Sequence, residues 1–491
     1  MSGSEYAQSV NSFREQCIAR VWDSYERTLR NEGALDFDDL LFRTLRLLRE
    51  SPQTLSLLQH RWTHITIDEY QDTNRSQYEI ARLLAGDRRN ICVVGDIDQN
   101  VYSWRGADIE HLMAFEDVFP GAGVVTLEQN YRSTRTILSA ANAVIERNVR
   151  RKPKTLFTEN ETGEPIKLYG AFNEGDEAWF VVAHATKLIK SGVLPREIAV
   201  LYRENFQSRA LEEAFLSSGI PYRLLGTRFF ERKEVKDVLS YLRAALNPKS
   251  TVDLRRIIAV PPRGIGATTL EKMLAGAVLP GAAGAKVAAF RDTLAAIKKA
   301  VETLPCADAV RFAYEISGIE ALLKKDTEEG EERIGNVQEL INLAARYNDA
   351  VPPEGVERLL EEAALQSDQD NLDDREDAVS LMTVHASKGL EFDAVFITGL
   401  EHGLFPSIRE GQSGDRDDEE ERRLFYVAVT RARKHLFLSY ANERMKYGQR
   451  ENAMPSEFIS EIDQRLIEWA SPRKSRRDEE DEGGERTIEL L

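Results

Sequence analysis

The sequence is poor in cysteine and has no long apolar stretch. Its 491 residues include three cysteines, Cys17, Cys92 and Cys306, which lie far apart. This usage argues against a disulfide framework or a cysteine-based metal site and favours a reducing compartment. No apolar run reaches the roughly 18 residues that suggest a membrane span. The N-terminal MSGSEYAQSV also lacks a basic segment followed by an apolar core. We therefore expect a cytoplasmic protein that does not associate with a membrane.

Positive charge is also in deficit. The chain has 65 Lys and Arg against 82 Asp and Glu, so its formal net charge is −17. Taken alone, this balance argues weakly against nucleic-acid binding, which favours a basic surface. The acidic residues gather in three runs at 367–377, 414–421 and 478–482, a pattern typical of solvated linkers or tails. Residues 127–155 are instead basic, with seven Lys or Arg and two acidic residues.

Short segments rich in Val and Ile alternate with helical patterns along most of the chain. Such alternation predicts an α/β fold with mainly parallel sheets. The expected strands cluster at about 61–127, 165–225 and 378–441, and the stretch 236–366 reads almost entirely as helix. We therefore expect a helical domain inserted into the second of two α/β domains.

A cluster of acidic and amide residues follows the expected strand 63–67. In THITIDEYQDTN (63–74), Asp68 and Glu69 fall at the carboxyl end of that strand, where parallel sheets place their ligands. Consecutive carboxylates there suit a Mg²⁺–nucleotide site. One holds a metal-bound water, and the other orients or deprotonates the attacking water. The alternative, a helix N-cap, accounts for Asp72–Asn74 but not for Asp68 and Glu69.

The next expected strand ends in a similar way. NICVVGDIDQNVYSWRGA (90–107) runs from an apolar segment to Gln99 and then to Tyr102, Trp104 and Arg105. An amide at a strand end can sense a phosphate or position a water. Exposed aromatics beside an arginine form a stacking platform for unpaired bases. The alternative is that Tyr102 and Trp104 are core aromatics.

Five motifs in order carry a family resemblance. IDEYQDTN (67–74), VVGDIDQNVYSWRGA (93–107), LEQNYRST (127–134), LMTVHASKGLEFDAVF (381–396) and ERRLFYVAVTRAR (421–433) resemble motifs of the superfamily 1 DNA helicases of the UvrD/PcrA/Rep type. The resemblance spans about residues 10–465. It implies two RecA-like parallel-sheet motor domains, the first truncated, with helical inserted domains. It also implies an ATP-dependent 3′-to-5′ helicase, active in DNA repair or replication, acting on single-stranded DNA and on single-strand/duplex junctions.

The resemblance assigns the nucleotide chemistry, with ATP and Mg²⁺ as cofactors. Asp68 and Glu69 hold the metal, and Glu69 is the base that activates water. Gln99 resembles the γ-phosphate sensor. The remaining ATP-binding residues come from later motifs, in which Tyr131 stacks on adenine, Arg132 contacts the γ-phosphate, Glu391 contacts the ribose and Arg431 is the arginine finger. Guanidinium groups suit phosphoryl transfer because they hold positive charge in a fixed geometry. We expect Arg132 and Arg431 on two facing domains.

The resemblance also assigns the DNA contacts. Tyr102 and Trp104 resemble the base-stacking pair, Arg105 supports that surface, and Thr383 and His385 resemble contacts to the single strand.

The turn PPRGIG (261–266) is a separate candidate for duplex contact. A Gly-x-Gly turn between helices exposes backbone N–H groups that can hold a phosphate, so Arg263, Gly264 and Gly266 are candidates. The alternative is an ordinary helix–helix turn.

One motif of the family is absent from this sequence. The phosphate-binding loop G-x-x-x-x-G-K-[ST] does not occur. In the nearest segment, GAAGAKV (281–287), the Lys follows Ala and precedes Val. The loop's backbone N–H groups and Lys supply most of the β- and γ-phosphate binding. We therefore expect weak or absent ATP hydrolysis by this chain alone, with a companion chain that carries the loop as a partner.

The resemblance implies a division of the chain into five parts. These are a remnant of a helical accessory domain (1–57), the C-terminal part of the first motor domain (58–160), the second motor domain (161–235 and 376–465), a helical inserted domain that contacts duplex DNA (236–375) and a disordered charged tail (466–491).

Two other function classes stay open. One is a catalytically impaired DNA-binding or interaction remnant, which the missing loop favours. The other is a nuclease that uses Asp68, Glu69 and Asp96 as a metal cluster, but it would leave Gln99 and the arginines without a purpose. The helicase interpretation implies a nucleoid-associated location.

Overall fold

The structure is a computed structural model that describes residues 3–9, 12–275, 277, 279–326, 330–369, 377–407, 418–446 and 449–470. Internal contacts divide the chain into two compact units. Unit 1 comprises Met1–Thr126 and Arg150–Pro153, and unit 2 comprises Leu127–Val149 and Lys154–Leu491. Each unit is described by itself below.

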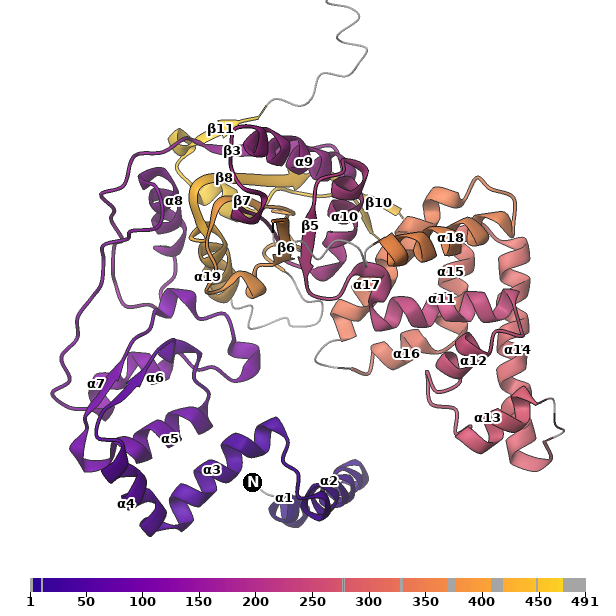
Figure 1. The fold of residues 1–491 in the computed structure, drawn as a ribbon, viewed down its shortest axis with the longest axis horizontal. Coiled ribbons are helices and arrows are strands. Elements are labelled where there is room, and N and C mark those ends of the chain that lie inside the picture. Colours follow the sequence, from indigo (N-terminus) through magenta and orange to yellow (C-terminus); the bar gives the residue numbers. More distant parts are fainter. Residues whose placement is uncertain are drawn as a thin grey trace, which may run out of the picture. The chain divides into compact units, whose positions relative to one another are not determined.

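Unit 1 is mostly helical and contains one small sheet (Figure 1). Its elements are α1 (Gly3–Ser9), α2 (Phe13–Glu32), α3 (Phe37–Glu50), α4 (Pro52–Arg61), β1 (Ile65–Ile67), α5 (Arg75–Ala85), β2 (Ile91–Val93), α6 (Glu110–Met113) and α7 (Phe115–Val118), with short 3₁₀ turns η1 (Tyr70–Asp72), η2 (Gly86–Arg88), η3 (Ile97–Gln99) and η4 (Ser103–Arg105). The strands β1 and β2 pair in parallel, with Ile65 opposite Ile91. Helix α5 is the main element of the connection between the two strands. It begins at a capping box formed by Asn74 and Gln77.

Three consecutive cations hold residues 150–153 against unit 1. The Arg151 guanidinium lies 2.8 Å from the Asp98 carboxylate, and both side chains are buried. Arg150 pairs with Glu110 at 3.0 Å, and Lys152 pairs with Glu116 at 3.1 Å. Part of the positive charge of the basic segment 127–155 is therefore neutralised inside unit 1.

The α/β part of unit 2 is built on a seven-stranded sheet whose pairings are all parallel. The strand order is β11-β3-β8-β7-β4-β6-β5. Its elements are α8 (Arg135–Ile145), β3 (Ile166–Ala171), α9 (Glu174–Lys190), η5 (Pro195–Glu197), β4 (Ile198–Tyr202), η6 (Asn205–Gln207), α10 (Ser208–Ser217), β5 (Tyr222–Leu225), β6 (Val379–Thr383), η10 (His385–Ser387), β7 (Phe392–Ile397), α19 (Asp418–Val429), β8 (Ala432–Ala441), β9 (Glu443–Lys446), β10 (Gln449–Asn452), α20 (Glu457–Glu461), η11 (Gln464–Leu466) and β11 (Ile467–Trp469). The predicted α/β fold with a parallel sheet is confirmed.

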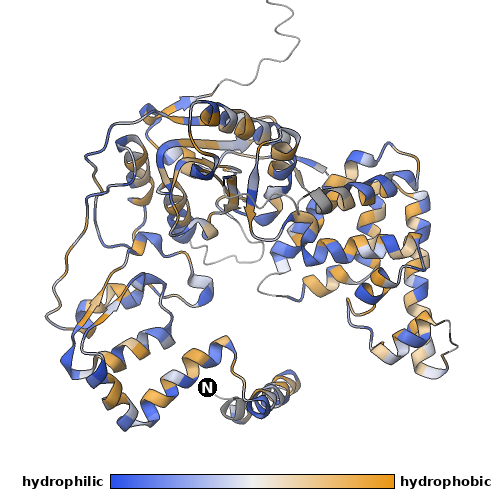
Figure 2. Cartoon of the chain, in the orientation of Figure 1, coloured by the Kyte–Doolittle hydropathy of each residue, from blue (hydrophilic) through white to orange (hydrophobic). Residues whose placement is uncertain are grey.

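The inner strand β4 shows the burial that is typical of a parallel sheet. Its five residues, IAVLY, are all buried, as expected for a strand with helices packed on both faces. Figure 2 shows apolar residues interleaved with hydrophilic ones along the helices of this unit, which is the pattern of helices that bury one face.

The helical part of unit 2 lies between two neighbouring strands. The chain leaves the sheet after β5 and returns at β6, and these strands pair from Tyr222 opposite Val379. The elements between them are η7 (Phe229–Glu231), α11 (Lys233–Leu246), α12 (Thr251–Ile257), α13 (Ala267–Leu274), α14 (Gly281–Thr303), α15 (Cys306–Ile316), α16 (Ile319–Leu323), α17 (Gly330–Ala344), η8 (Ala345–Tyr347) and α18 (Glu354–Gln369). They share one apolar core that includes Val238, Phe290 and Leu340.

Two predicted boundaries differ from the units and elements of the structure. Residues 127–149 and 154–160 belong to unit 2 rather than to the first motor domain, because α8 buries Ile137, Leu138 and Val144 and packs against α19. The predicted tail 466–491 begins too early, because Ile467–Trp469 pairs with β3 as an edge strand. The rest of that tail, from residue 471, lies outside the described residues.

A buried ion cluster joins three elements at the carboxyl ends of the strands in unit 2. Arg444, on β9, lies 2.7 Å from Glu177 of α9 and 2.5 Å from Glu401, which follows β7. Glu177 also accepts hydrogen bonds from the Gly399 N–H and the Ser439 hydroxyl, each at 2.8 Å. Burial alone would lower the pKa of Arg444, but the attraction of the two carboxylates raises it well above its ordinary value.

Replacing Arg444 with Met should lower the free energy of unfolding of unit 2 by about 3–5 kcal/mol, because two buried carboxylates lose their partner. Arg450→Met is the matched control on the same hairpin. Arg450 is half exposed and lies 3.4 Å from Glu443, so its loss should cost about 1 kcal/mol or less. Urea unfolding followed by circular dichroism measures both variants. Equal destabilisation would show that the buried cluster is not a stabilising centre.

Candidate functional site

The two carboxylates after β1 are exposed and closely spaced. Asp68 and Glu69 follow Ile67 directly, and the Glu69 N–H donates to Asp68 Oδ1 at 2.9 Å. Glu69 has a φ of 51°, in the left-handed region that non-glycine residues rarely adopt. Such local strain is common where a functional side chain must be aimed.

A buried amide, Gln71, connects the ends of β1 and β2. Its Nε2 donates to Glu69 Oε2 at 2.6 Å, and its Oε1 accepts from the Asp96 N–H at 2.9 Å. Gln99 Nε2 in turn donates to Asp96 Oδ2 at 2.9 Å. A hydrogen-bonded chain therefore runs from Glu69 to Gln99, and it links the predicted base to the predicted phosphate sensor. The sequence reasoning missed Gln71, although its position two residues after Glu69 was a usable signal.

Gly95 leaves room for this amide. A Cβ added at Gly95 would lie 2.7 Å from Gln71 Oε1 and 3.2 Å from a Leu112 methyl carbon. A side chain there would displace the amide from the Asp96 N–H. Gly95 is therefore required because the Gln71 side chain lies so close to its Cα that a Cβ would not fit.

The carboxylates of unit 1 fit a magnesium–nucleotide complex. Mg²⁺ in such sites takes one or two carboxylates and fills its other positions with water and phosphate oxygens. Asp68 and Glu69 offer oxygen ligands that are open to solvent at a strand end. Within the described residues, no three His, Cys, Asp or Glu side chains form a metal-binding group.

The predicted stacking residues form a compact surface group. The Tyr102 and Trp104 ring centroids are 6.4 Å apart, and the Arg105 guanidinium carbon lies 4.5 Å from the Trp104 centroid and 5.5 Å from that of Tyr102. Trp104 is 61% exposed, so it is not a core residue. An indole held by an arginine and open to solvent offers a free π-face.

In unit 2, the segment 130–134 is tied to the segment 430–433. Asn130 Oδ1 accepts from the N–H groups of Arg132 and Ser133 at 3.0 and 2.9 Å. The Ser133 hydroxyl donates to the Ala432 carbonyl at 2.7 Å, and the Thr134 N–H donates to the Arg433 carbonyl at 3.0 Å. These bonds fix the start of α8 beside the start of β8.

Tyr131 projects from this anchored segment. Its side chain is 77% exposed, and its hydroxyl donates to Gln129 at 3.0 Å. An exposed ring on a fixed turn can stack on a planar ligand.

Glu391 bridges two arginines. Its Oε2 lies 2.5 Å from Arg132 Nε, and its Oε1 lies 2.7 Å from Arg433 Nη2. Arg433 also lies 2.9 Å from Glu197. Hydrogen bonds from Arg433, and then from Arg132, lower the pKa of Glu391. Both arginines are partly exposed, so this face carries two accessible cations around one carboxylate. Arg433, the second arginine of TRAR, was not predicted.

Arg431 lies on the same unit as Arg132, not on a facing domain as we expected. Its side chain is buried and donates to the Val427 carbonyl at 3.0 Å and the Leu390 carbonyl at 3.1 Å. In this arrangement its guanidinium faces the protein. A role as an arginine finger stays a prediction, and it requires those bonds to open.

Thr383 and His385 sit at the carboxyl end of β6. The Val384 N–H between them donates to the Tyr202 carbonyl at 2.9 Å, and the Ala386 N–H donates to Thr383 Oγ1 at 3.4 Å. Both side chains are partly exposed. They thus lie at the edge where parallel sheets bind their ligands, and their contact with a single strand stays a prediction.

The PPRGIG turn is stabilised by its own arginine. Arg263 donates to the carbonyls of Pro261 and Ser317 at 2.9 and 2.7 Å, and it lies over the Tyr241 and Phe290 rings. These contacts favour the alternative of an ordinary turn for Arg263. Its DNA contact stays a prediction.

The two glycines of this turn remain at its surface. Gly264 has a φ of 66°, and its carbonyl accepts from Lys286 Nζ at 3.2 Å. Gly266 is the residue before α13 and is also exposed. Lys286 is hydrogen-bonded to the turn itself, and a phosphate contact by Gly264 and Gly266 stays a prediction.

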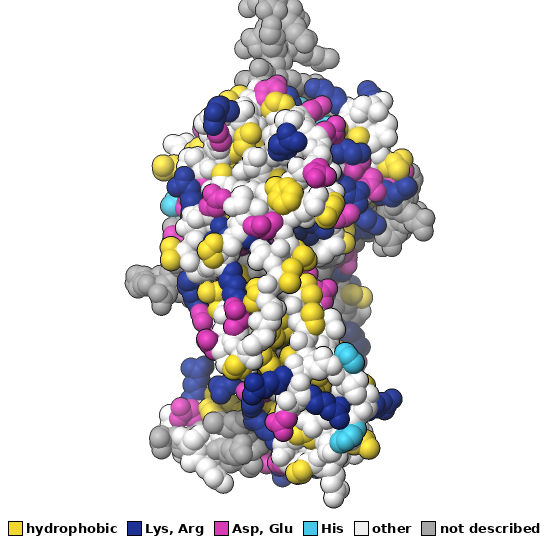
Figure 3. Space-filling view, turned by 90° about the vertical axis from the view of Figure 1, so that its left-hand side faces the viewer, with side chains coloured by type: hydrophobic (Ala, Val, Ile, Leu, Met, Phe, Trp, Pro, Cys, Tyr) yellow, Lys and Arg dark blue, Asp and Glu magenta, His cyan; other side chains and the backbone are white. Residues whose placement is uncertain are grey.

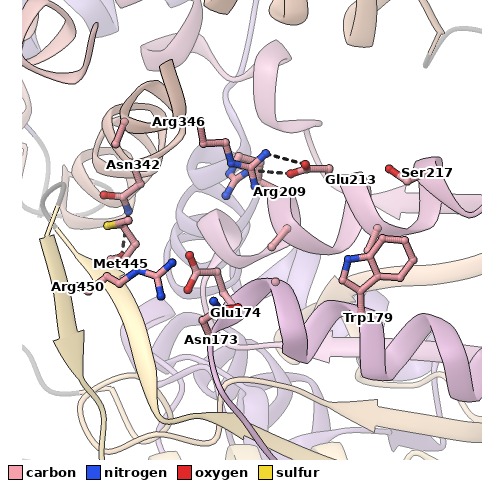
Figure 4. A pocket seen from close by; sticks show the side chains of 14 residues that line it. Asn173, Glu174, Trp179, Arg209, Glu213, Ser217, Asn342, Arg346, Met445 and Arg450 are labelled. Carbon is pink, nitrogen blue, oxygen red and sulfur yellow. Dashed lines mark hydrogen bonds and ion pairs between the residues drawn. The ribbon is translucent and has the colours of Figure 1, made fainter. Parts of the chain in front are cut away.

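A cavity of about 370 Å³ lies where the helical part of unit 2 meets the sheet part (Figure 4). Arg209 and Arg346 both bind Glu213, at 3.0 and 2.6 Å. Arg450 and Glu174 point into the same space in Figure 4. The cavity is lined by none of the predicted site residues. Cations and carboxylates nearly balance around it, so its charge favours no ligand class.

Comparison with known proteins decides the family. Residues 2–120 match the UvrD/REP helicase N-terminal domain, and residues 125–280 and 281–443 match the UvrD-like helicase C-terminal domain. The ATP-dependent DNA helicases PcrA of Staphylococcus aureus (strain MRSA252) and of Staphylococcus epidermidis (strain ATCC 35984) are each 41% identical over 489 residues, covering 95% of this chain and 67% of theirs. The chain belongs to the UvrD/Rep family of DNA helicases. The predicted resemblance is confirmed.

A solved structure is also similar in part. It is the C-terminal domain of a possible DNA helicase from Lactobacillus plantarum WCFS1, with 11% identity and a TM-score of 0.28 over 69% of this chain and 98% of that one. A TM-score this low does not establish a shared fold.

None of the described helices of this UvrD-family chain is long and apolar enough to cross a membrane.

Gln71→Leu tests the hydrogen-bonded chain of unit 1. Leucine keeps the bulk but leaves the partly buried Asp96 N–H without its acceptor, which costs up to about 1–3 kcal/mol. We expect hydrogen exchange of residues 91–96 to accelerate roughly tenfold or more. The control is Gln53→Leu on the exposed face of α4, which should leave that exchange unchanged. Unaltered exchange in Gln71→Leu would show that the amide does not hold β1 to β2.

Proposed function

We propose that the chain is an ATP-dependent DNA translocase and helicase that acts on single-stranded DNA and on single-strand/duplex junctions with 3′-to-5′ polarity. The family supplies the activity class, since its curated members in the comparison are ATP-dependent DNA helicases. The polarity and the junction substrate rest on the motif resemblance. The residues of this chain supply the roles below.

One observation supports the proposal: Gln99, the proposed phosphate sensor, and the proposed DNA residues of unit 1 share a single short segment. Gln99, which is hydrogen-bonded to Asp96, ends the turn η3. Tyr102 follows three residues later, and its carbonyl accepts from the Arg105 and Ala107 N–H groups at 3.0 and 3.2 Å. A displacement of Gln99 by a phosphate would therefore be transmitted directly to the stacking platform.

The nucleotide roles follow from geometry and chemistry. Mg²⁺ would be held by Asp68 and Glu69, where it would neutralise charge on the transferring phosphoryl group. Glu69 is oriented by Gln71, so its carboxylate is placed to accept a proton from water. Tyr131 offers a ring for adenine. Arg132 and Arg433 supply accessible positive charge, and Glu391 supplies a ribose contact once it releases Arg132.

DNA binding by this chain would depend mainly on stacking. The net charge is −17, and Figure 3 shows cationic and anionic side chains interspersed over one face rather than separated. Few phosphates are then neutralised, so few counterions are released on binding. Stacking contributes about 1–3 kcal/mol per base and tolerates any sequence.

Trp104→Ala should weaken single-strand binding by roughly tenfold, about 1.4 kcal/mol. The wild-type chain should bind oligonucleotides weakly, with little sequence preference and a shallow salt dependence. Fluorescence anisotropy with a labelled oligonucleotide over a salt series measures this. Trp62→Ala is the matched control, because Trp62 is also an exposed tryptophan with an arginine, Arg61, over its ring.

Two results would contradict the stacking role. Wild-type affinity in Trp104→Ala would mean that the indole makes no DNA contact. An equal loss in Trp62→Ala would mean that the effect is not specific to the platform.

The absent phosphate-binding loop supports a second candidate, an impaired DNA-binding form that needs a companion segment. We expect the chain alone to bind ATP–Mg²⁺ far more weakly than the low-micromolar range in isothermal titration. If a fragment carrying the loop restores turnover, Glu69→Gln should leave ATP binding nearly intact and cut turnover by roughly a hundredfold or more. Low-micromolar ATP binding by the chain alone would exclude the impaired form.

A further inference from the structure

A second cavity, of about 430 Å³, lies among α11, α12, α13 and α14 in the helical part of unit 2. Its floor is apolar and includes Leu254, Met273, Phe290 and Leu294, each at most 9% exposed. The volume is in the range of ordinary ligand pockets. None of the residues assigned above to nucleotide or DNA binding lines it.

The rim of this cavity carries charge of one sign. Lys249, Arg291 and Lys298 line it and are exposed, and no Asp or Glu is among its lining residues. Lys298 has only a loose partner, Glu302, at 3.8 Å. The chain has 82 acidic and 65 basic residues, but three cations and no carboxylate line this cavity, so its rim is locally basic. The apolar floor and the cationic rim together suit an occupant that has both apolar and negatively charged groups.

We propose that this cavity binds an acidic peptide segment of a partner protein, one that places apolar side chains next to its carboxylates. The apolar side chains would fill the floor between α12, α13 and α14, and the carboxylates would pair with Arg291 and Lys298. Burial of apolar groups supplies most of the affinity in such grooves, and rim charges supply selectivity and association rate.

Duplex DNA is the main competing occupant. The PPRGIG turn directly precedes α13, so phosphates bound there could reach the rim cations. The DNA backbone, however, has no apolar group that would fill the floor of the cavity. Burial of the floor residues would therefore add nothing to the affinity for DNA. The composition of the cavity therefore favours a peptide over DNA.

The probe is a fluorescein-labelled peptide with four acidic residues followed by Ile, Leu and Phe, titrated with the full chain in fluorescence anisotropy. One control peptide carries amides in place of its carboxylates, and a second carries Ser in place of its apolar residues. Each control should bind about tenfold or more weakly than the probe, since each removes one of the two contributions.

Two variants test the location. Arg291→Glu combined with Lys298→Glu should weaken probe binding by about tenfold or more, while Lys299→Glu, on the same helix but outside the lining, should not. Ala295→Trp places a large ring at the exposed edge of the cavity without changing charge. It should abolish binding although the helix stays intact.

Three outcomes would overturn the proposal. Equal binding of the Ser-substituted peptide would mean that the floor is not used. Wild-type peptide binding in the Arg291/Lys298 variant, with loss of duplex binding in the same variant, would assign the rim to DNA. Much tighter probe binding by a chain that ends at Ala470 would mean that the acidic C-terminal residues of the chain itself are the occupant.

Discussion

Hydrogen bonds between polar groups at the carboxyl ends of the parallel strands hold neighbouring segments together in both units. A buried N–H or carbonyl left unpaired costs as much as a lost hydrogen bond. In unit 1, Gln71 satisfies the Asp96 N–H after β2 while it holds Glu69 after β1. In unit 2, Glu177 accepts from Gly399 after β7 and from Ser439 on β8. Ligands of parallel sheets bind at this same edge. The groups that close the fold therefore also position the site.

The arginines of unit 2 show how such a site can respond to a ligand. Arg132 and Arg433 share Glu391, and Arg431 donates to backbone carbonyls. A phosphate that binds Arg132 as proposed must compete with Glu391 for the guanidinium. The displaced carboxylate keeps Arg433 as a partner, so the exchange leaves no buried charge unpaired. Ser133 and Thr134 are hydrogen-bonded to the carbonyls of residues 432 and 433. A shift of Arg132 would therefore also move the start of β8.

The sequence alone predicts the parallel sheet and the position of Asp68 and Glu69 at the end of β1. The run IAVLY predicts a strand buried on both faces, and five ordered motifs identify the family. It was insufficient for Arg263 and Arg431, because whether a guanidinium faces solvent or donates to carbonyls depends on residues distant in the chain, such as Ser317 and Leu390. The same holds for residues 127–149, whose apolar helical face would suit a contact in either unit. The packing of α8 against α19 is what assigns these residues to unit 2.

An acidic chain that binds a polyanion needs contacts that do not depend on net charge. Arg105 lies over two aromatic rings, so part of its electrostatic attraction is directed to their π-faces rather than to phosphates. Residues 150–152, which the sequence marks as basic, are paired with carboxylates of unit 1. In the proposed mode, the exposed face of Trp104 supplies unit 1 with a stacking contact that does not depend on the net charge of the chain. Affinity would then change little with ionic strength, and a displaced Gln99 would alter the platform by moving a ring rather than by moving a charge.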